Sequence, residues 1–256
     1  MPSSFIVNEQ GWALTGGTEM KVRYIWEHNG DDSLIYAENF TGAFVRGESK
    51  HEALAKFEDE IRSYVLWRDD NTLAEMPLEC EMSSEHISGL NICDADSDVL
   101  FDSEKSPLKL EEYITLKTLA LKSAKSFQTL YDSIPDKNST CLLRRKTFYG
   151  ETPVTAAEMY AHTKSVNAYY FGEIGIPASN EPDILTCRRL GFEALEQNGD
   201  FLVNGVFDGS YGERWSLRKV CRRFVWHDRI HAKAMWRMAK RVFNVDQIEN
   251  PFYFSV

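Results

Sequence analysis

The spacing of apolar positions changes along this chain, from an alternating pattern near the N-terminus to a helical one further on. Several short segments alternate or are rich in Val, Ile, Tyr, Phe and Trp, which is typical of strands. Turn-forming residues at 28–32 predict that the first two of these strands form a hairpin. Residues 1–18 are polar without a clear period, so we expect a leader with little regular structure. The predicted strands are Met20–Glu27, Ser33–Glu38, Ala43–Arg46, Glu81–Ile87 and Val99–Phe101.

One helix is expected among these strands. Apolar residues recur at helical spacing from Leu54 to Val65, and Ser49 with Glu52 forms a capping box just before them. These features predict a helix over about Lys50–Trp67. Residues 19–104 are therefore expected to form a small α+β domain.

The second half of the chain is predicted to be all helical. Strand patterning stops near Asp102–Pro107, where Pro and polar residues cluster. Four long periodic segments follow, with caps or with Gly and Pro at their ends. We expect residues 105–256 to form a four-helix bundle. The predicted helices are Leu108–Ile134, Thr155–Ile174, Pro182–Gln197 and Ser216–Phe243.

Charge divides the chain at the same place. Residues 1–104 contain 7 Lys and Arg against 22 Asp and Glu, and the rest contains 22 against 17. A strongly acidic segment argues against binding to a phosphate backbone, which needs clustered cations. The basic residues of the last helix, Arg218, Lys219, Arg222, Arg223 and Arg229, are a candidate patch for nucleic acid, but we interpret them as a solvated helix face.

The remaining composition indicates an ordinary soluble protein. No apolar run has the length of a membrane span, and the N-terminus lacks the pattern of a secretory signal. The 5 cysteines are an odd number without metal-type spacing, so we expect reduced thiols. We therefore predict a cytoplasmic protein with no membrane partner.

Candidate chemistry lies on the apolar faces of two predicted helices. His227 and His231 are four residues apart on the last helix, so their imidazoles can converge on one point. His162 lies on the apolar face of the second helix, beside Met159 and Val166. In helical bundles, metal sites are built from inward side chains of facing helices. Three imidazoles suit Zn, Ni, Fe or Co and leave positions open for water or substrate.

Each histidine also has a structural interpretation. A single histidine on an apolar face is more often a core residue than a ligand, and pairs at this spacing also arise by chance. Three buried imidazoles without partners would be costly, however, and one metal ion would satisfy all three. Glu158 and Asp228 could orient the ligands by accepting a ring N–H. Alternatively, Glu158 only completes a capping box with Thr155, and Asp228 belongs to a surface pair with Arg229.

Two motifs in this half resemble the DinB-like (YfiT-like) superfamily of metal-binding four-helix bundles. They are 155–162, TAAEMYAH, and 215–233, which begins WSLRKV and contains WHDRIHAK. The resemblance covers nearly all of residues 106–243 and maps the family's ligand triad onto His162, His227 and His231. It implies an open divalent-metal site, often Zn or Ni. Characterised relatives include thiol-dependent S-transferases and a mycothiol-dependent isomerase, and dimers are common.

The first half resembles the HicB-like family over roughly Met20–Pro107. The resemblance rests on a short β-hairpin, the segment GAFVRGES at 42–49, and Glu52-Ala53-Leu54 at the start of a helix. It implies a small α/β sandwich that binds a partner protein or, through an added segment, operator DNA. No such added segment is visible here.

Two functional hypotheses follow. The first is a cytosolic metal-dependent enzyme, a thiol-dependent S-transferase or a related hydrolase or isomerase, acting on a small-molecule thiol and an electrophile. Its N-terminal module would serve docking, dimerisation or pocket closure. The second is a metal-stabilised adaptor or stress-response regulator whose HicB-like module binds a partner protein. An enzyme needs an open coordination site and a pocket, whereas an adaptor could have a closed site.

Overall fold

A computed structural model describes residues 6–7, 13–14, 19–148 and 150–255. Near the N-terminus, β1 (Ile6–Val7) pairs with β2 (Ala13–Leu14) in an antiparallel ladder. Most of the predicted leader lies outside the described residues.

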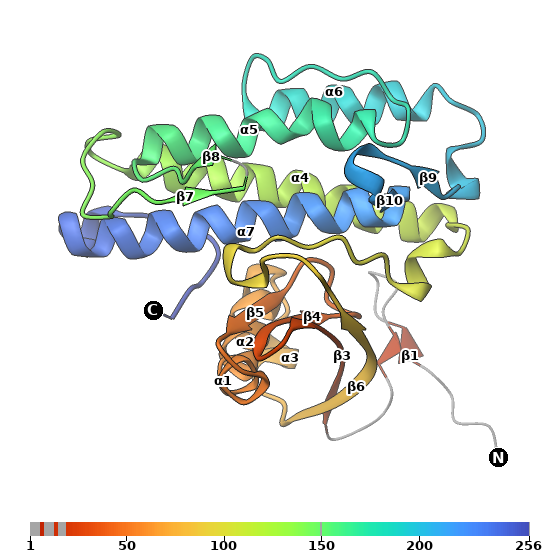
Figure 1. Ribbon diagram of the computed structural model, residues 1–256, viewed down its shortest axis with the longest axis horizontal. Coiled ribbons are helices and arrows are strands. Elements are labelled where there is room, and N and C mark those ends of the chain that lie inside the picture. The colour runs from red at the N-terminus through yellow and green to blue at the C-terminus, as the bar shows by residue number, and fades with distance from the viewer. Residues whose placement is uncertain (1–5, 8–12, 15–18, 149, 256) are drawn as a thin grey trace.

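The N-terminal region is an α+β unit with a four-stranded sheet in the order β5-β4-β3-β6 (Figure 1). The first three strands form antiparallel pairs, and β6 lies parallel to β3 at one edge. Gly30 has a φ of +61° in the β3–β4 turn, a conformation that favours glycine. The strands are β3 (Met20–Asn29), β4 (Asp32–Ala37), β5 (Phe44–Gly47) and β6 (Leu78–Ile87).

At β4, one of its two inner strands, this sheet is covered on both faces. One face packs on the helices α1 (Lys50–Ala55) and α2 (Phe57–Trp67), which a short α3 (Asn71–Ala74) follows. The other face buries Ile25, Leu34 and Tyr36 against Trp226 of the last helix. This double burial explains why β4 is apolar on both sides, with a buried side chain at every position after the first.

Two N-terminal predictions need correction. The single helix expected over Lys50–Trp67 is divided at Lys56, although Ser49 caps its start as predicted. Val99–Phe101 is not a strand. Val99 and Phe101 belong to the connecting segment, residues 88–109 between β6 and α4. They are apolar because they pack on the last helix, and not because they pair in a sheet.

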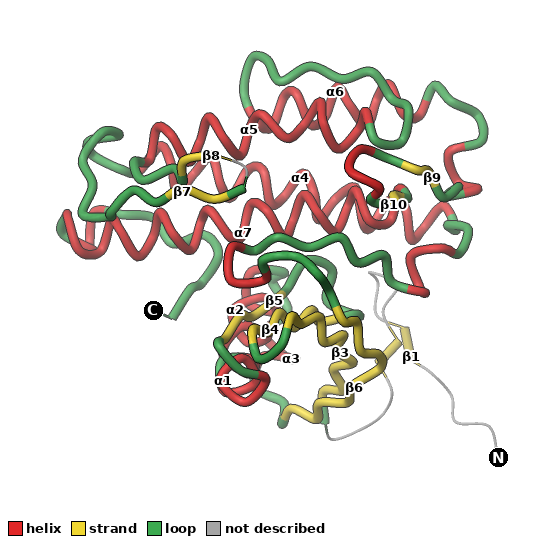
Figure 2. The backbone as a smooth tube through the Cα atoms, viewed as in Figure 1, coloured by secondary structure: helices red, strands yellow, loops and turns green. Residues whose placement is uncertain are grey.

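Four long helices form the C-terminal half and pack side by side, with α4 and α5 each contacting both α6 and α7 (Figures 1 and 2). Thr155, Asp183 and Ser216 cap the last three of them. Pro182 was expected in the first turn of its helix but precedes the cap instead. The helices are α4 (Leu110–Ser133), α5 (Ala156–Gly172), α6 (Ile184–Glu196) and α7 (Leu217–Val242).

Short elements join these helices. β7 (Lys146–Thr147) pairs with β8 (Gly150–Glu151), and β9 (Phe207–Asp208) pairs with β10 (Arg214–Trp215). Among the described residues, no helix is both long and apolar enough to cross a membrane. The single turns of 3₁₀-helix are η1 (Ile92–Asp94), η2 (Asp102–Lys105), η3 (Phe201–Val203), η4 (Ser210–Gly212) and η5 (Val245–Gln247).

Helix α7 lies between the other long helices and the N-terminal region, and its basic residues are not a solvated face (Figure 1). Arg222 pairs with Glu104 of the connecting segment, and Arg229 pairs with Glu60 of α2. The interpretation as a solvated helix face is therefore wrong, and the candidate nucleic-acid patch is lost with it, because most of these cations are buried against carboxylates. The opposite charges of the two halves meet at this interface. The members of the patch that are buried are Lys219, Arg222, Arg223 and Arg229.

Candidate metal centre

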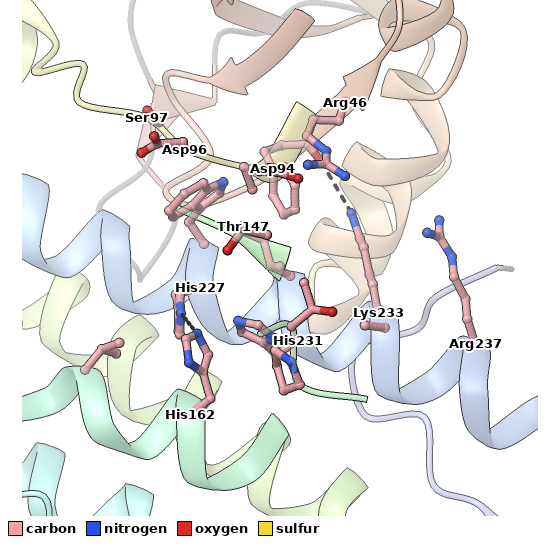
Figure 3. Close-up of a pocket in the computed structure, with 18 of the residues that line it drawn as sticks. Arg46, Asp94, Asp96, Ser97, Thr147, His162, His227, His231, Lys233 and Arg237 are labelled. Atoms are coloured by element: carbon pink, nitrogen blue, oxygen red, sulfur yellow. Dashed lines mark hydrogen bonds between the residues drawn. The ribbon is translucent and has the colours of Figure 1, made fainter. Parts of the chain in front are cut away.

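The three predicted ligands meet between α5 and α7 (Figure 3). His227 and His231 lie one turn apart on α7, and His162 reaches them from α5, which packs against α7. The Nε2 atoms of His162 and His227 are 3.2 Å apart. The ring of His231 lies 4.6 Å from that of His162 and 4.5 Å from that of His227, between centroids. One ring nitrogen from each histidine lies within 4.8 Å of the others.

These separations fit a shared divalent ion. Zinc binds imidazole nitrogen at about 2.0–2.1 Å, so tetrahedral ligand atoms lie about 3.4 Å apart. The separation of 3.2 Å between the Nε2 atoms is close to that value. Two neutral imidazoles could also share one hydrogen bond, but a third ring within reach would then have no partner. One metal ion accounts for the convergence of all three.

Burial keeps these imidazoles neutral. The His227 side chain is 8% exposed, and the other two are half-buried. Loss of hydration lowers the pKa of His162, lowers the pKa of His227 well below its usual value, and lowers the pKa of His231 to about 3. The neighbouring rings add to the effect at His227 and His231, because two imidazolium ions would repel each other. Neutral imidazole is the form that binds metals.

We expect the metal-free protein to lose stability as the pH falls below about 6.5. The depressed pKa values mean that the unfolded chain takes up protons in that range while the folded chain resists them. His231→Gln should reduce the loss between pH 6.5 and pH 5 by up to about 2 kcal/mol, since each such group contributes about 1.4 kcal/mol per pH unit. Urea unfolding of both proteins at the two pH values measures the difference. Equal pH dependence would show that His231 is protonated as easily in the folded chain.

A cavity of about 890 Å³ opens directly beside the triad. One wall comes from α5 and α7, with the aromatic side chains of Tyr169 and Tyr170 and the aliphatic side chain of Ile230. The opposite wall comes from the N-terminal region and its connecting segment, including Phe44 and Arg46. The β7–β8 hairpin covers a third side, where Figure 3 shows Thr147 near the histidines.

Most of the residues around this cavity were not predicted from the sequence. Arg46, Asp94 and Lys233 line it, but Lys233 alone is close in sequence to a predicted ligand. Lys233 donates to Glu60, and Arg145 of the hairpin segment pairs with Asp94. These groups come from separate elements, so no spacing in the sequence could have brought them together. For Lys233, its position two residues after His231 could have indicated that it lies near the metal centre.

The two residues suggested as orienting partners do not contact the triad. Asp228 is fully buried and accepts two hydrogen bonds from Arg188 of α6. Glu158 accepts from the backbone of Val154 and pairs with Arg144, so it serves the helix cap. The surface interpretation of Asp228 is also wrong. Within the described part of the chain, Nδ1 of His227 is buried without a hydrogen-bond partner.

Comparison with protein-family models, with curated proteins and with solved structures found no match for this chain.

Proposed function

We propose that this chain is a divalent-metal-dependent enzyme acting on a small molecule. The observation that carries the proposal is the position of three convergent histidines on the wall of a cavity of about 890 Å³. That volume is within the range of pockets that hold small-molecule ligands. A metal that only stabilised the fold would not need such a space beside it.

His162, His227 and His231 would hold the ion. Among the described residues, their cluster includes no fourth His, Cys, Asp or Glu within reach. Three protein ligands leave a position for water or a substrate atom, which is the arrangement of catalytic sites and not of closed structural sites. When bound, the metal would lower the pKa of a water or thiol ligand and so supply a nucleophile at neutral pH.

The side chains around the triad supply binding and orientation. Tyr169, Tyr170, Trp226 and Ile230 offer an apolar wall that can exclude water from a substrate body. Arg46 is a half-buried guanidinium whose hydrogen bonds go to the backbone carbonyls of Ile92 and Cys93. Burial lowers the pKa of Arg46, which is the cost of a charge held at the cavity wall. An anionic group on the substrate would relieve that cost.

The sequence resemblance limits the number of candidate reactions. We propose that the four long helices form a DinB-like bundle, with zinc or nickel as the metal. The chemistry would then be transfer to or from a low-molecular-weight thiol, or a related hydrolysis or isomerisation. The N-terminal region, with its HicB-like sequence, would act by completing the cavity, because Phe44, Arg46 and Asp94 lie on its wall.

The second candidate is the metal-stabilised adaptor whose N-terminal module binds a partner protein. No contact among the described residues favours it over the enzyme. It would gain support if the metal proved inaccessible to small chelating thiols.

Metal analysis of untagged protein tests the proposal. The parent should contain about one equivalent of zinc or nickel in the triad. His162→Ala, His227→Ala and His231→Ala should each lose that equivalent, because two remaining imidazoles bind far more weakly. His51→Ala is the matched control, since His51 is exposed on α1 and should keep the metal.

The same variants serve a screen of thiols with electrophilic acceptors. Activity of the parent that falls at least about 100-fold in all three triad variants would support an enzyme. Unchanged metal content in His231→Ala would overturn the triad. Full metal content with no thiol binding, measured by the visible spectrum of the cobalt-substituted protein, would favour the adaptor.

A further inference from the structure

A second group of potential metal ligands lies on the N-terminal sheet, away from the triad. Glu27 on β3 is directly opposite His86 on β6 in the parallel ladder, so both side chains lie on the same face. Asp98, from the connecting segment, lies over that face. One oxygen of each carboxylate and a ring nitrogen of His86 lie within 4.8 Å of one another.

Glu27 is the unusual member of this group. Its side chain is completely buried, and one carboxylate oxygen, Oε1, has no hydrogen-bond partner among the described residues. A buried carboxylate without full compensation is costly, so it needs a proton or a cation beside it. The cluster is therefore more than a set of acidic residues on a surface.

The other oxygen of Glu27 is held in place. Oε2 accepts a hydrogen bond of 2.5 Å from the hydroxyl of Ser97, which itself accepts one of 2.8 Å from the phenol of Tyr36. Tyr36 and Ser97 are buried. Such chains orient the carboxylates that ligate metals and leave the second oxygen directed at the ion.

We propose that Glu27, His86 and Asp98 form a second divalent-cation site. One imidazole and two carboxylates suit Zn²⁺, Mn²⁺ or Fe²⁺. His86 and Asp98 are 41% and 48% exposed, so an ion can enter from solvent, while Glu27 anchors the inner side. Nε2 of His86 and Oδ1 of Asp98 are 3.4 Å apart.

The position of the site suggests its role. Asp98 and Ser97 belong to the segment that lies along α7, where Lys219 donates to the carbonyl of Asp98 at 2.7 Å. Ser97 and Asp96 also line the main cavity. A cation bound here would fix this segment to the sheet and so hold one wall of the cavity. It would stabilise the fold whether or not the triad binds metal.

Zinc stoichiometry of the full-length protein, by equilibrium dialysis and elemental mass spectrometry, tests the site. The parent should bind about two equivalents, and Glu27→Gln, His86→Ala and His231→Ala about one each. The double variant Glu27→Gln/His231→Ala should bind none. Glutamine keeps the shape of Glu27 and can still accept from Ser97, so this variant should fold.

His28→Ala is the matched control, because His28 pairs with Glu85 on the same two strands but lies outside the cluster. It should keep both equivalents. Zinc should also raise the melting temperature of His231→Ala and leave that of the double variant unchanged. A parent with one equivalent, lost entirely in His231→Ala, would overturn the second site. Loss confined to the cluster variants, with His231→Ala unaffected, would support it and reject the triad.

Discussion

Replacement of Asp228 by alanine is expected to lower the free energy of unfolding by about 3–5 kcal/mol. Asp228 and Arg188 are both fully buried, and the two side chains form a bidentate pair between α7 and α6. Removal of the carboxylate leaves the Arg188 guanidinium buried without its counter-charge. Urea unfolding monitored by circular dichroism measures the loss.

The pair Arg188→Met/Asp228→Leu separates the cost of an orphaned charge from the value of the ion pair. A buried ion pair replaced by apolar residues of similar volume is often neutral in stability. The double variant should therefore be more stable than Asp228→Ala. If Asp228→Ala lost less than about 1 kcal/mol, the buried pair would not exist in solution. Metal content should stay unchanged, since Asp228 does not contact the histidines.

Glu60→Ala should also lower the free energy of unfolding by about 3–5 kcal/mol, because Glu60 links the N-terminal region to α7. Glu60 on α2 is 4% exposed and accepts from Arg229 and Lys233 of α7. Burial alone would raise its pKa, but these two cations hold the pKa of Glu60 below its usual range. Alanine would leave the buried guanidinium of Arg229 and the partly buried ammonium of Lys233 without their shared carboxylate. Thermal and urea unfolding should both report the loss.

Glu58→Ala is the control on the same helix. Glu58 pairs with Arg62 one turn away on the surface, where an ion pair contributes about 0.3–0.5 kcal/mol. A Glu60→Ala protein as stable as Glu58→Ala would mean that α2 does not dock on α7. Because Lys233 lines the cavity, Glu60→Ala should also alter ligand binding there.

Local patterns were sufficient to predict most elements. Helical spacing and caps located all four long helices, and the caps at Ser49 and Thr155 are confirmed. These signals act within one or two turns, so a single sequence contains them. The convergence of His162 with His227 and His231 was also predictable, because each lies on the apolar face of its helix.

Contacts between distant segments were not predictable in this way. The basic residues of α7 have the composition of a solvated face, yet Arg229 is buried because Glu60, far away in sequence, neutralises it. Val99 and Phe101 have strand-like composition because α7 covers them. Asp228 was assigned to the wrong partner for the same reason, since Arg188 approaches from another helix. Each error concerns burial that only tertiary packing decides.

The exposed edge strand β6 affects how copies of this protein associate in solution. It lies at one end of the sheet, and nearly all of its ten side chains are exposed. Among the described residues no strand pairs with its outer side, and an edge of this length can pair with another strand and begin aggregation. Three glutamates, at 79, 81 and 85, lie along it. Their negative charges would repel each other across two facing edges and so keep molecules apart.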